Sequence, residues 1–195
     1  MSGIAESAGR VHGDVRQRLL DTAYELFSHR GIRAVGVDEV IERAGVAKAT
    51  LYRHFPSKDN LVVAFLELRE QRWSRELLQD GSRRLATTPE QQLLAVFEVL
   101  DGWFRSDDYE ACSYINVLLE MGAQHPAGRA AIDHLANIRL FVRDLAEQAG
   151  LRDPEAFAYA FQILMKGAII GAAEGDLEAA QRAGSVARLL VEAYR

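Results

Sequence analysis

The sequence is poor in the residues that would direct it to most other classes of protein. Cys112 is the only cysteine among 195 residues, which excludes an intrachain disulfide and a thiolate metal cluster and suits a reducing compartment. Four prolines, 15 glycines and little β-branched alternation favour helices over strands. No uncharged apolar run approaches the roughly 18 residues of a membrane span, and residues 1–13 lack the apolar block of a secretory signal. We therefore expect a soluble, cytoplasmic, helical protein.

The motifs of common enzymes are also missing. The chain has no Gly-x-Ser-x-Gly, no phosphate-binding glycine loop and no His-Glu-x-x-His. Its five histidines show no spacing that suggests metal ligands. The sequence predicts no catalytic residues, no metal and no cofactor.

Charge is divided unevenly along the chain. The net charge is −5, but residues 1–59 carry nine Lys and Arg against eight Asp and Glu, while residues 60–195 carry fourteen against twenty. The acidity therefore belongs to the C-terminal part. The sequence permits a locally basic face near the N-terminus without requiring one.

Apolar periodicity predicts an all-α fold. Apolar residues recur at helical spacing from Asp14, and breaks follow at Gly31, Gly45 and Pro56. The first three helices make a compact unit of about 50 residues, which is small for independent stability. A fourth helix is expected to run to about Asp80, and polar residues 81–89 follow it. Further helices are expected at about 89–105, 110–122, 127–149, 154–173 and 176–194, which gives a disordered tail (1–13), an N-terminal domain (14–72) and a C-terminal domain (73–195).

Residues 36–58 have the pattern of a helix-turn-helix. Val40, Leu51 and Phe55 can hold two short helices at a fixed angle about the turn at Gly45. Such a unit presents the start of its second helix to the major groove of DNA.

The second helix offers groups suited to DNA. Lys and Arg neutralise phosphate, hydroxyl groups bond phosphate or base edges, and a small Ala permits close approach. Tyr52 could instead pack between helices, His54 could satisfy carbonyl groups at the helix end, and Arg43 fits a solvated face. The candidates for DNA contact in and after this helix are Lys48, Ala49, Thr50, Tyr52, Arg53, His54 and Lys58.

The stretch Ala44-Gly45-Val46-x-Lys48-x-Thr50-Leu51-Tyr52-x-His54-Phe55-x-x-Lys58, with Leu26-Phe27 and Gly31 before it, resembles the DNA-binding domain of TetR-family regulators. The resemblance implies base or backbone contacts for Lys48, Thr50 and Arg53 and phosphate contacts for Tyr52, His54 and Lys58. The chain departs from the family where many members have threonine, because it reads Val35-Gly36-Val37-Asp38. With that hydroxyl missing, we expect the phosphate contact to come instead from the backbone amide of Gly36 or Val37, and Asp38 would repel phosphate if it faced the DNA.

The C-terminal part resembles the family in layout, which implies a helical ligand-binding and dimerisation domain. The stretch from Ala111 to Glu120 is similar to a Gly-Cys-x-hydrophobic-x-Asn-x-x-x-Glu segment of one subgroup, with Ala111 in place of glycine. The aromatic residues could equally fill a core, Asn116 and Glu120 could cap or bridge helices, and Cys112 could be a buried apolar residue rather than a redox sensor. The candidates for a ligand pocket are Trp103, Tyr109, Cys112, Tyr114, Asn116, Glu120, Phe161 and Met165.

The last two helices are the expected dimer interface. Small residues such as Gly167 and Gly171 permit close helix approach, and Val186 and Leu189 give the final helix an apolar face. The sequence thus predicts a homodimeric regulator, namely a repressor that an unidentified small molecule releases from a palindromic double-stranded operator. The alternative is a constitutive regulator or DNA-organising protein with no effector.

Overall fold

The computed structural model describes the backbone of residues 3–107 and 109–195, and side chains from Val15 onward within these ranges. Every regular element in this part of the chain is a helix, so the predicted all-α fold is confirmed. Contacts divide the chain into two compact units. The first unit comprises Met1–Arg69 and Ser113–Ala131, and the second comprises Glu70–Cys112 and Ile132–Arg195.

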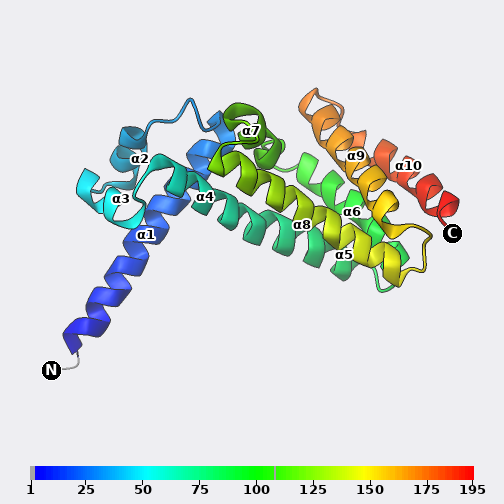
Figure 1. The fold of residues 1–195 in the computed structure, drawn as a ribbon, viewed down its shortest axis with the longest axis horizontal. Coiled ribbons are helices and arrows are strands. Elements are labelled where there is room, and N and C mark those ends of the chain that lie inside the picture. The colour runs from blue at the N-terminus through cyan, green and yellow to red at the C-terminus, as the bar shows by residue number, and fades with distance from the viewer. Residues whose placement is uncertain (1–2, 108) are drawn as a thin grey trace. The chain divides into compact units, whose positions relative to one another are not determined.

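The first unit is built around a small apolar core. Figure 1 shows α2 and α3 beside α1, and these helices contact one another. Leu26 and Leu51 are buried, and the Phe65 ring lies edge-on to Phe27 with centroids 5.6 Å apart. The helices of this unit are α1 (Gly3–Arg30), α2 (Val37–Ala44), α3 (Lys48–His54), α4 (Lys58–Arg69), α7 (Ser113–Met121) and the first turns of α8 (Pro126–Gln148).

The first helix is longer than the sequence pattern indicated. It begins at Gly3, so the helix start expected at Asp14 is corrected. Alanine and glutamate in this stretch favour helix, whereas its three glycines oppose it, so local composition did not signal the helix. Residues 1–2 of the tail expected over 1–13 lie outside the described residues.

The second unit centres on three long helices. In Figure 1, α6, α9 and α10 run side by side, and each contacts the other two. Their facing sides bury Phe97 and Phe161, whose ring centroids lie 5.1 Å apart. The helices of this unit are η1, a π-helical stretch (Glu70–Gln79), α5 (Asp80–Leu85), α6 (Pro89–Phe104), the remainder of α8, α9 (Pro154–Ala173) and α10 (Ala179–Ala193).

Helical structure continues beyond the point where the sequence predicted the end of the fourth helix, just before Gly81. α5 continues through Gly81, although the sequence predicted an end near Asp80. Gly81 is buried, and a Cβ atom built on it would lie 2.9 Å from Cγ2 of Val99. This glycine therefore permits close approach between α5 and α6 instead of ending a helix.

Residues 113–131 belong to the first unit, whereas the sequence assigned all of 73–195 to one C-terminal domain. Two side chains explain this placement. Glu120 accepts a hydrogen bond of 2.8 Å from the Arg33 backbone N–H, and His125 Nε2 lies 3.3 Å from a carboxylate oxygen of Asp59. Apolar periodicity carries no information about such polar contacts.

By length and composition α9 could cross a membrane, with a mean hydropathy of 1.5 over its best window. Several of its apolar side chains instead lie inside the second unit. Phe157 is fully buried, and its ring centroid lies 5.5 Å from that of Tyr194. These contacts are those of a core helix.

Candidate nucleic-acid interface

The turn between α2 and α3 fixes the angle between the two helices. Gly45 adopts a left-handed conformation with φ 64° and ψ 42°, which glycine tolerates best. Its N–H donates to the Glu42 carbonyl at 3.1 Å, and the Val46 N–H donates to the Ile41 carbonyl at 3.2 Å. These bonds satisfy the last carbonyl groups of α2.

α3 has one buried side and one exposed side. Leu51 is fully buried and Phe55 nearly so, which holds the helix against the core. Tyr52 is 41% exposed, so its ring is not enclosed between helices. Among the predicted contact residues, Lys48, Ala49, Tyr52 and Arg53 are exposed, and Thr50 and His54 are half-buried.

The start of α2 lies open to solvent. Gly36, the N-cap residue, is exposed and extended, with φ −80° and ψ 153°, and no side chain caps the helix. Val37 is half-buried. Because the first amides of a helix have no partner within it, the amides near Gly36 and Val37 are suited to an anion.

Lys58 does not join the exposed face of α3. It is half-buried, and its Nζ donates a hydrogen bond of 2.6 Å to the Ile32 carbonyl. Burial lowers the pKa of Lys58, against the opposing charge of Glu120. Lys58, predicted to contact phosphate, thus joins α4 to Ile32 in this structure.

Two contacts made by charged residues of this region could not be predicted from the sequence. Asp38, in the first turn of α2, accepts a hydrogen bond of 2.9 Å from Lys48 Nζ, and this bond raises the pKa of Lys48. The Arg16 guanidinium lies over the Phe55 ring, 5.0 Å from its centroid. Both contacts join residues from different helices, and no local spacing signals them.

Two ligand-pocket candidates of the second unit, Trp103 and Tyr109, pack on each other. The Trp103 ring lies 5.2 Å from Trp73 and 4.9 Å from Tyr109, between centroids. The Tyr109 hydroxyl donates to the Ile169 carbonyl, and burial raises the pKa of Tyr109 to about 12. The other candidates of this unit, Cys112, Phe161 and Met165, are buried.

The remaining pocket candidates belong to the first unit. Tyr114 is buried and Asn116 is exposed. Glu120 accepts a hydrogen bond from the Arg33 N–H. It therefore bridges two segments of the chain, which the sequence left open as the alternative to a ligand contact. The predicted set is thus divided between the two units.

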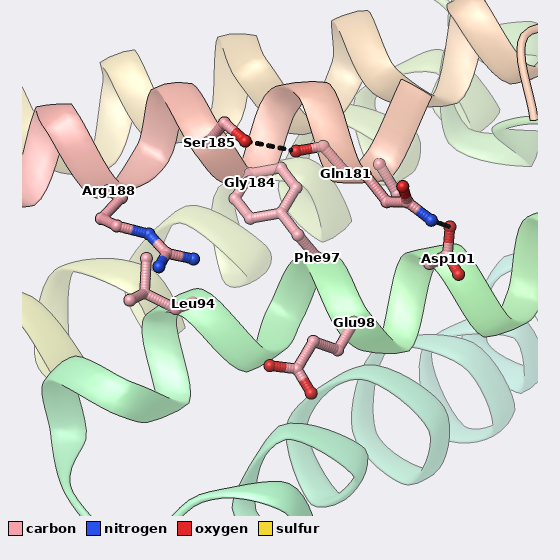
Figure 2. Close-up of a pocket in the computed structure, with 9 residues that line it drawn as sticks. Leu94, Phe97, Glu98, Asp101, Gln181, Gly184, Ser185 and Arg188 are labelled. Atoms are coloured by element: carbon pink, nitrogen blue, oxygen red, sulfur yellow. Dashed lines mark hydrogen bonds between the residues drawn. The ribbon is translucent and has the colours of Figure 1, made fainter. Parts of the chain in front are cut away.

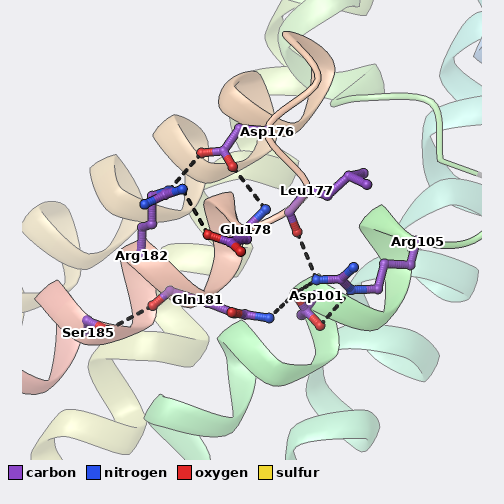
Figure 3. A network of polar contacts seen from close by, with 8 residues as sticks. All are labelled: Asp101, Arg105, Asp176, Leu177, Glu178, Gln181, Arg182 and Ser185. Carbon is purple, nitrogen blue, oxygen red and sulfur yellow. Dashed lines mark hydrogen bonds and ion pairs between the residues drawn. The ribbon is translucent and has the colours of Figure 1, made fainter.

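The second unit also carries a groove of about 530 Å³ between α6 and α10 (Figure 2). At one end Asp101 accepts hydrogen bonds from Arg105 Nε at 3.0 Å and from Gln181 Nε2 at 3.3 Å, a network drawn in Figure 3. The groove is lined by Leu94, Phe97, Glu98, Asp101, Ala180, Gln181, Gly184, Ser185 and Arg188.

An apolar surface is exposed along α9 and α10. On α9, Tyr159, Ile163 and Ile170 lie one or two turns apart and are at least 44% exposed. On α10, Val186 and Leu189 are similarly open. Of the small residues on α9, Gly171 packs within the protomer, where a Cβ on it would lie 3.3 Å from the Ala179 side chain, whereas Gly167 is exposed with no atom within 4 Å of such a Cβ.

The all-helical fold and the exposed side of α3 in the α2–α3 unit define a helix-turn-helix DNA-binding protein. Residues 19–65 match the family model described as bacterial regulatory proteins, tetR family. Transcriptional regulator AcuR of Cereibacter sphaeroides is 30% identical over 167 residues, which cover 80% of this chain and 75% of AcuR. The chain belongs to the TetR family of transcriptional regulators.

A further relative and a solved structure agree with this assignment. The HTH-type transcriptional activator FasR of Mycolicibacterium smegmatis is 39% identical over 94 residues, which cover 47% of this chain and only 41% of FasR. A crystal structure of a TetR-family regulator from Streptomyces coelicolor has a TM-score of 0.85 and 28% identity, and the match covers 100% of this chain and 96% of that one.

Proposed function

We propose that the protein is a cytoplasmic repressor that binds a palindromic operator as a homodimer. The observation that carries the proposal is the exposed side of α3, where Lys48, Tyr52 and Arg53 stand clear of the core that holds Leu51. Charged and hydroxyl groups on such a helix suit both phosphate and base edges. The open amides at Gly36 and Val37 supply a further phosphate contact.

The dimer is proposed to form through α9 and α10. An apolar face is exposed to water along these helices, formed by Ile163, Ile170, Val186 and Leu189. Its exposure is unfavourable in free energy, and a symmetric four-helix contact between two protomers would bury it. Each protomer then places one α3 in the major groove, with half-sites about 34–36 Å apart or a multiple of that spacing.

Repression requires only that the dimer occupies its operator, whereas activation requires a further contact with the transcription machinery. A small molecule would relieve repression if it bound more tightly to a conformation of the dimer in which the two α3 helices have a different spacing. The groove between α6 and α10 has a volume of about 530 Å³, within the range of ligand pockets.

Selection of fragments from the source genome by the purified protein tests this function, because it yields the operator and its neighbouring genes together. Lys48→Ala and Tyr52→Ala are expected to lose operator affinity while sedimenting as the wild-type dimer. Full affinity in both variants would contradict the assigned contacts.

A regulator without an effector is the second candidate. The ring contact between Trp103 and Tyr109 and the burial of Phe161 and Met165 favour it, because buried side chains that already have neighbours leave less room for a ligand. A thermal-shift screen separates the candidates. A compound that raises the melting temperature of the wild type but not of Ser185→Trp, which fills the groove, supports the effector, and no hit supports the alternative.

A further inference from the structure

An exposed ion pair stands within the DNA-binding face. Asp38, in the first turn of α2, and Lys48, the first residue of α3, lie 2.9 Å apart and are both open to solvent. Such pairs add little to stability because water competes for both charges. The pair therefore orients the two side chains without preventing either from binding DNA.

The carboxylate weakens binding to DNA of arbitrary sequence. Non-specific affinity comes from cations that replace counterions at phosphates. A phosphate bound by Lys48 lies close to the Asp38 carboxylate, and repulsion between these two negative groups offsets part of the attraction. The favourable partner for the intact pair is a surface that offers an acceptor and a donor together.

A G·C pair presents such a surface in the major groove. Guanine offers the acceptors O6 and N7, which suit a lysine, and cytosine offers its N4 amine, which suits a carboxylate. O6 and N4 are joined by a Watson–Crick hydrogen bond of about 2.9 Å. This spacing matches the 2.9 Å between Lys48 Nζ and Asp38 Oδ1.

An A·T pair matches less well. A carboxylate at the adenine N6 amine would lie beside the acceptor N7, and a lysine at thymine O4 would meet the neighbouring methyl group. Lysine also loses the second acceptor that guanine provides. The same two side chains therefore discriminate between the two kinds of base pair.

We propose that Asp38 and Lys48 act as one unit that reads a single G·C pair in each half-site, and that Asp38 lowers affinity for all other DNA. This inference rests on the proposed operator binding. It assigns a specificity role to the acidic residue that stands near the family's usual threonine.

The test compares wild type, Asp38→Asn and Glu42→Gln on a library of the selected operator with each half-site position randomised. Glu42 is an exposed acid of the same helix, so its variant loses the same charge without touching Lys48. Thermal unfolding of all three proteins checks that the fold is retained.

Wild type and Glu42→Gln are expected to prefer G·C at one position per half-site by roughly 5- to 100-fold. Asp38→Asn is expected to lose most of that preference. It should also bind unrelated DNA more tightly, with a salt dependence steeper by about one phosphate contact per protomer.

Three results would overturn the inference. The first is an Asp38→Asn profile identical to wild type, and the second is an equal change in Glu42→Gln. Both would leave operator binding itself intact. The third is a wild-type protein that selects no operator, which would remove the proposed function as well.

Discussion

At the scale of single residues, Ala111 carries backbone strain. Its φ is 58°, a left-handed conformation that costs an L-residue with a side chain about 1–2 kcal/mol. Ala111 also stands where the similar subgroup segment has glycine. Ala111→Gly is expected to raise the free energy of unfolding by about 0.5–1 kcal/mol, after the greater flexibility of the unfolded chain is subtracted.

Urea unfolding measures this change. Ala160→Gly, inside α9, is the matched control and should lower stability by about 1 kcal/mol. A destabilised Ala111→Gly variant would contradict the strain at this position.

Tyr109 predicts a specific alkaline behaviour. Burial raises its pKa to about 12, from 10.0. Its protonated form therefore supports folding fully below about pH 10, and this contribution is lost as the pH rises through about 12, because the unfolded chain releases its proton first. In Tyr109→Phe the fall of stability between these pH values should be shallower. Urea unfolding of wild type and Tyr109→Phe at pH 9 and pH 11 measures this difference. An equal fall in the free energy of unfolding for the two proteins would be inconsistent with the buried phenol.

The sequence could predict some site residues but not others. Leu51 and Phe55 set the inner side of α3 by local spacing, so the outward position of Lys48, Tyr52 and Arg53 followed from it. The direction of a long flexible side chain depends on tertiary neighbours. The inward turn of Lys58 could not be predicted for that reason.

At the scale of elements, α7 is tied to the loop before α2. Glu120 accepts the Arg33 N–H at 2.8 Å, and hydrogen bonds to charged groups contribute more than neutral ones. Glu120→Ala should lower the free energy of unfolding by about 1–2 kcal/mol. It should also weaken operator binding, because the segment that positions α2 loses its anchor.

Chemical denaturation and operator titration together measure this effect. Glu120→Gln keeps the acceptor oxygen without the charge and is expected to lose less of both properties than Glu120→Ala. Equal losses in the two variants would show that the charge, and not the hydrogen bond, is what matters.

Element boundaries were predictable where the local chemistry is strong. Pro154 in the first turn of α9, with Asp153 as its N-cap, fixed that helix start, and Asp153 Oδ1 accepts the Ala156 N–H at 3.2 Å. Gly81 was misleading because its role depends on Val99 of another helix. A glycine that permits close approach has the same local signature as one that ends a helix.

At the scale of the whole molecule, the proposed dimer depends on the apolar face of α9 and α10. Ile163 is 67% exposed in the single protomer. Ile163→Asp should leave the protomer folded but place a charge in the interface, which shifts the protein to monomer. Sedimentation velocity measures the change, and operator affinity should fall with it.

Leu85 provides the control, since it is also well exposed but lies on α5. Leu85→Asp is expected to remain dimeric. A dimeric Ile163→Asp would place the interface elsewhere on the chain.

The spacing of the two half-sites tests the central claim most directly. Operator affinity is measured by fluorescence anisotropy between about 50 and 200 mM salt, with and without about five extra base pairs, half a helical turn, at the centre of the palindrome. A symmetric dimer that inserts α3 twice should bind the native operator with steep salt dependence and lose at least roughly 100-fold in affinity on insertion, since specific exceeds non-specific binding by more than that. Equal affinity for both operators would contradict the account.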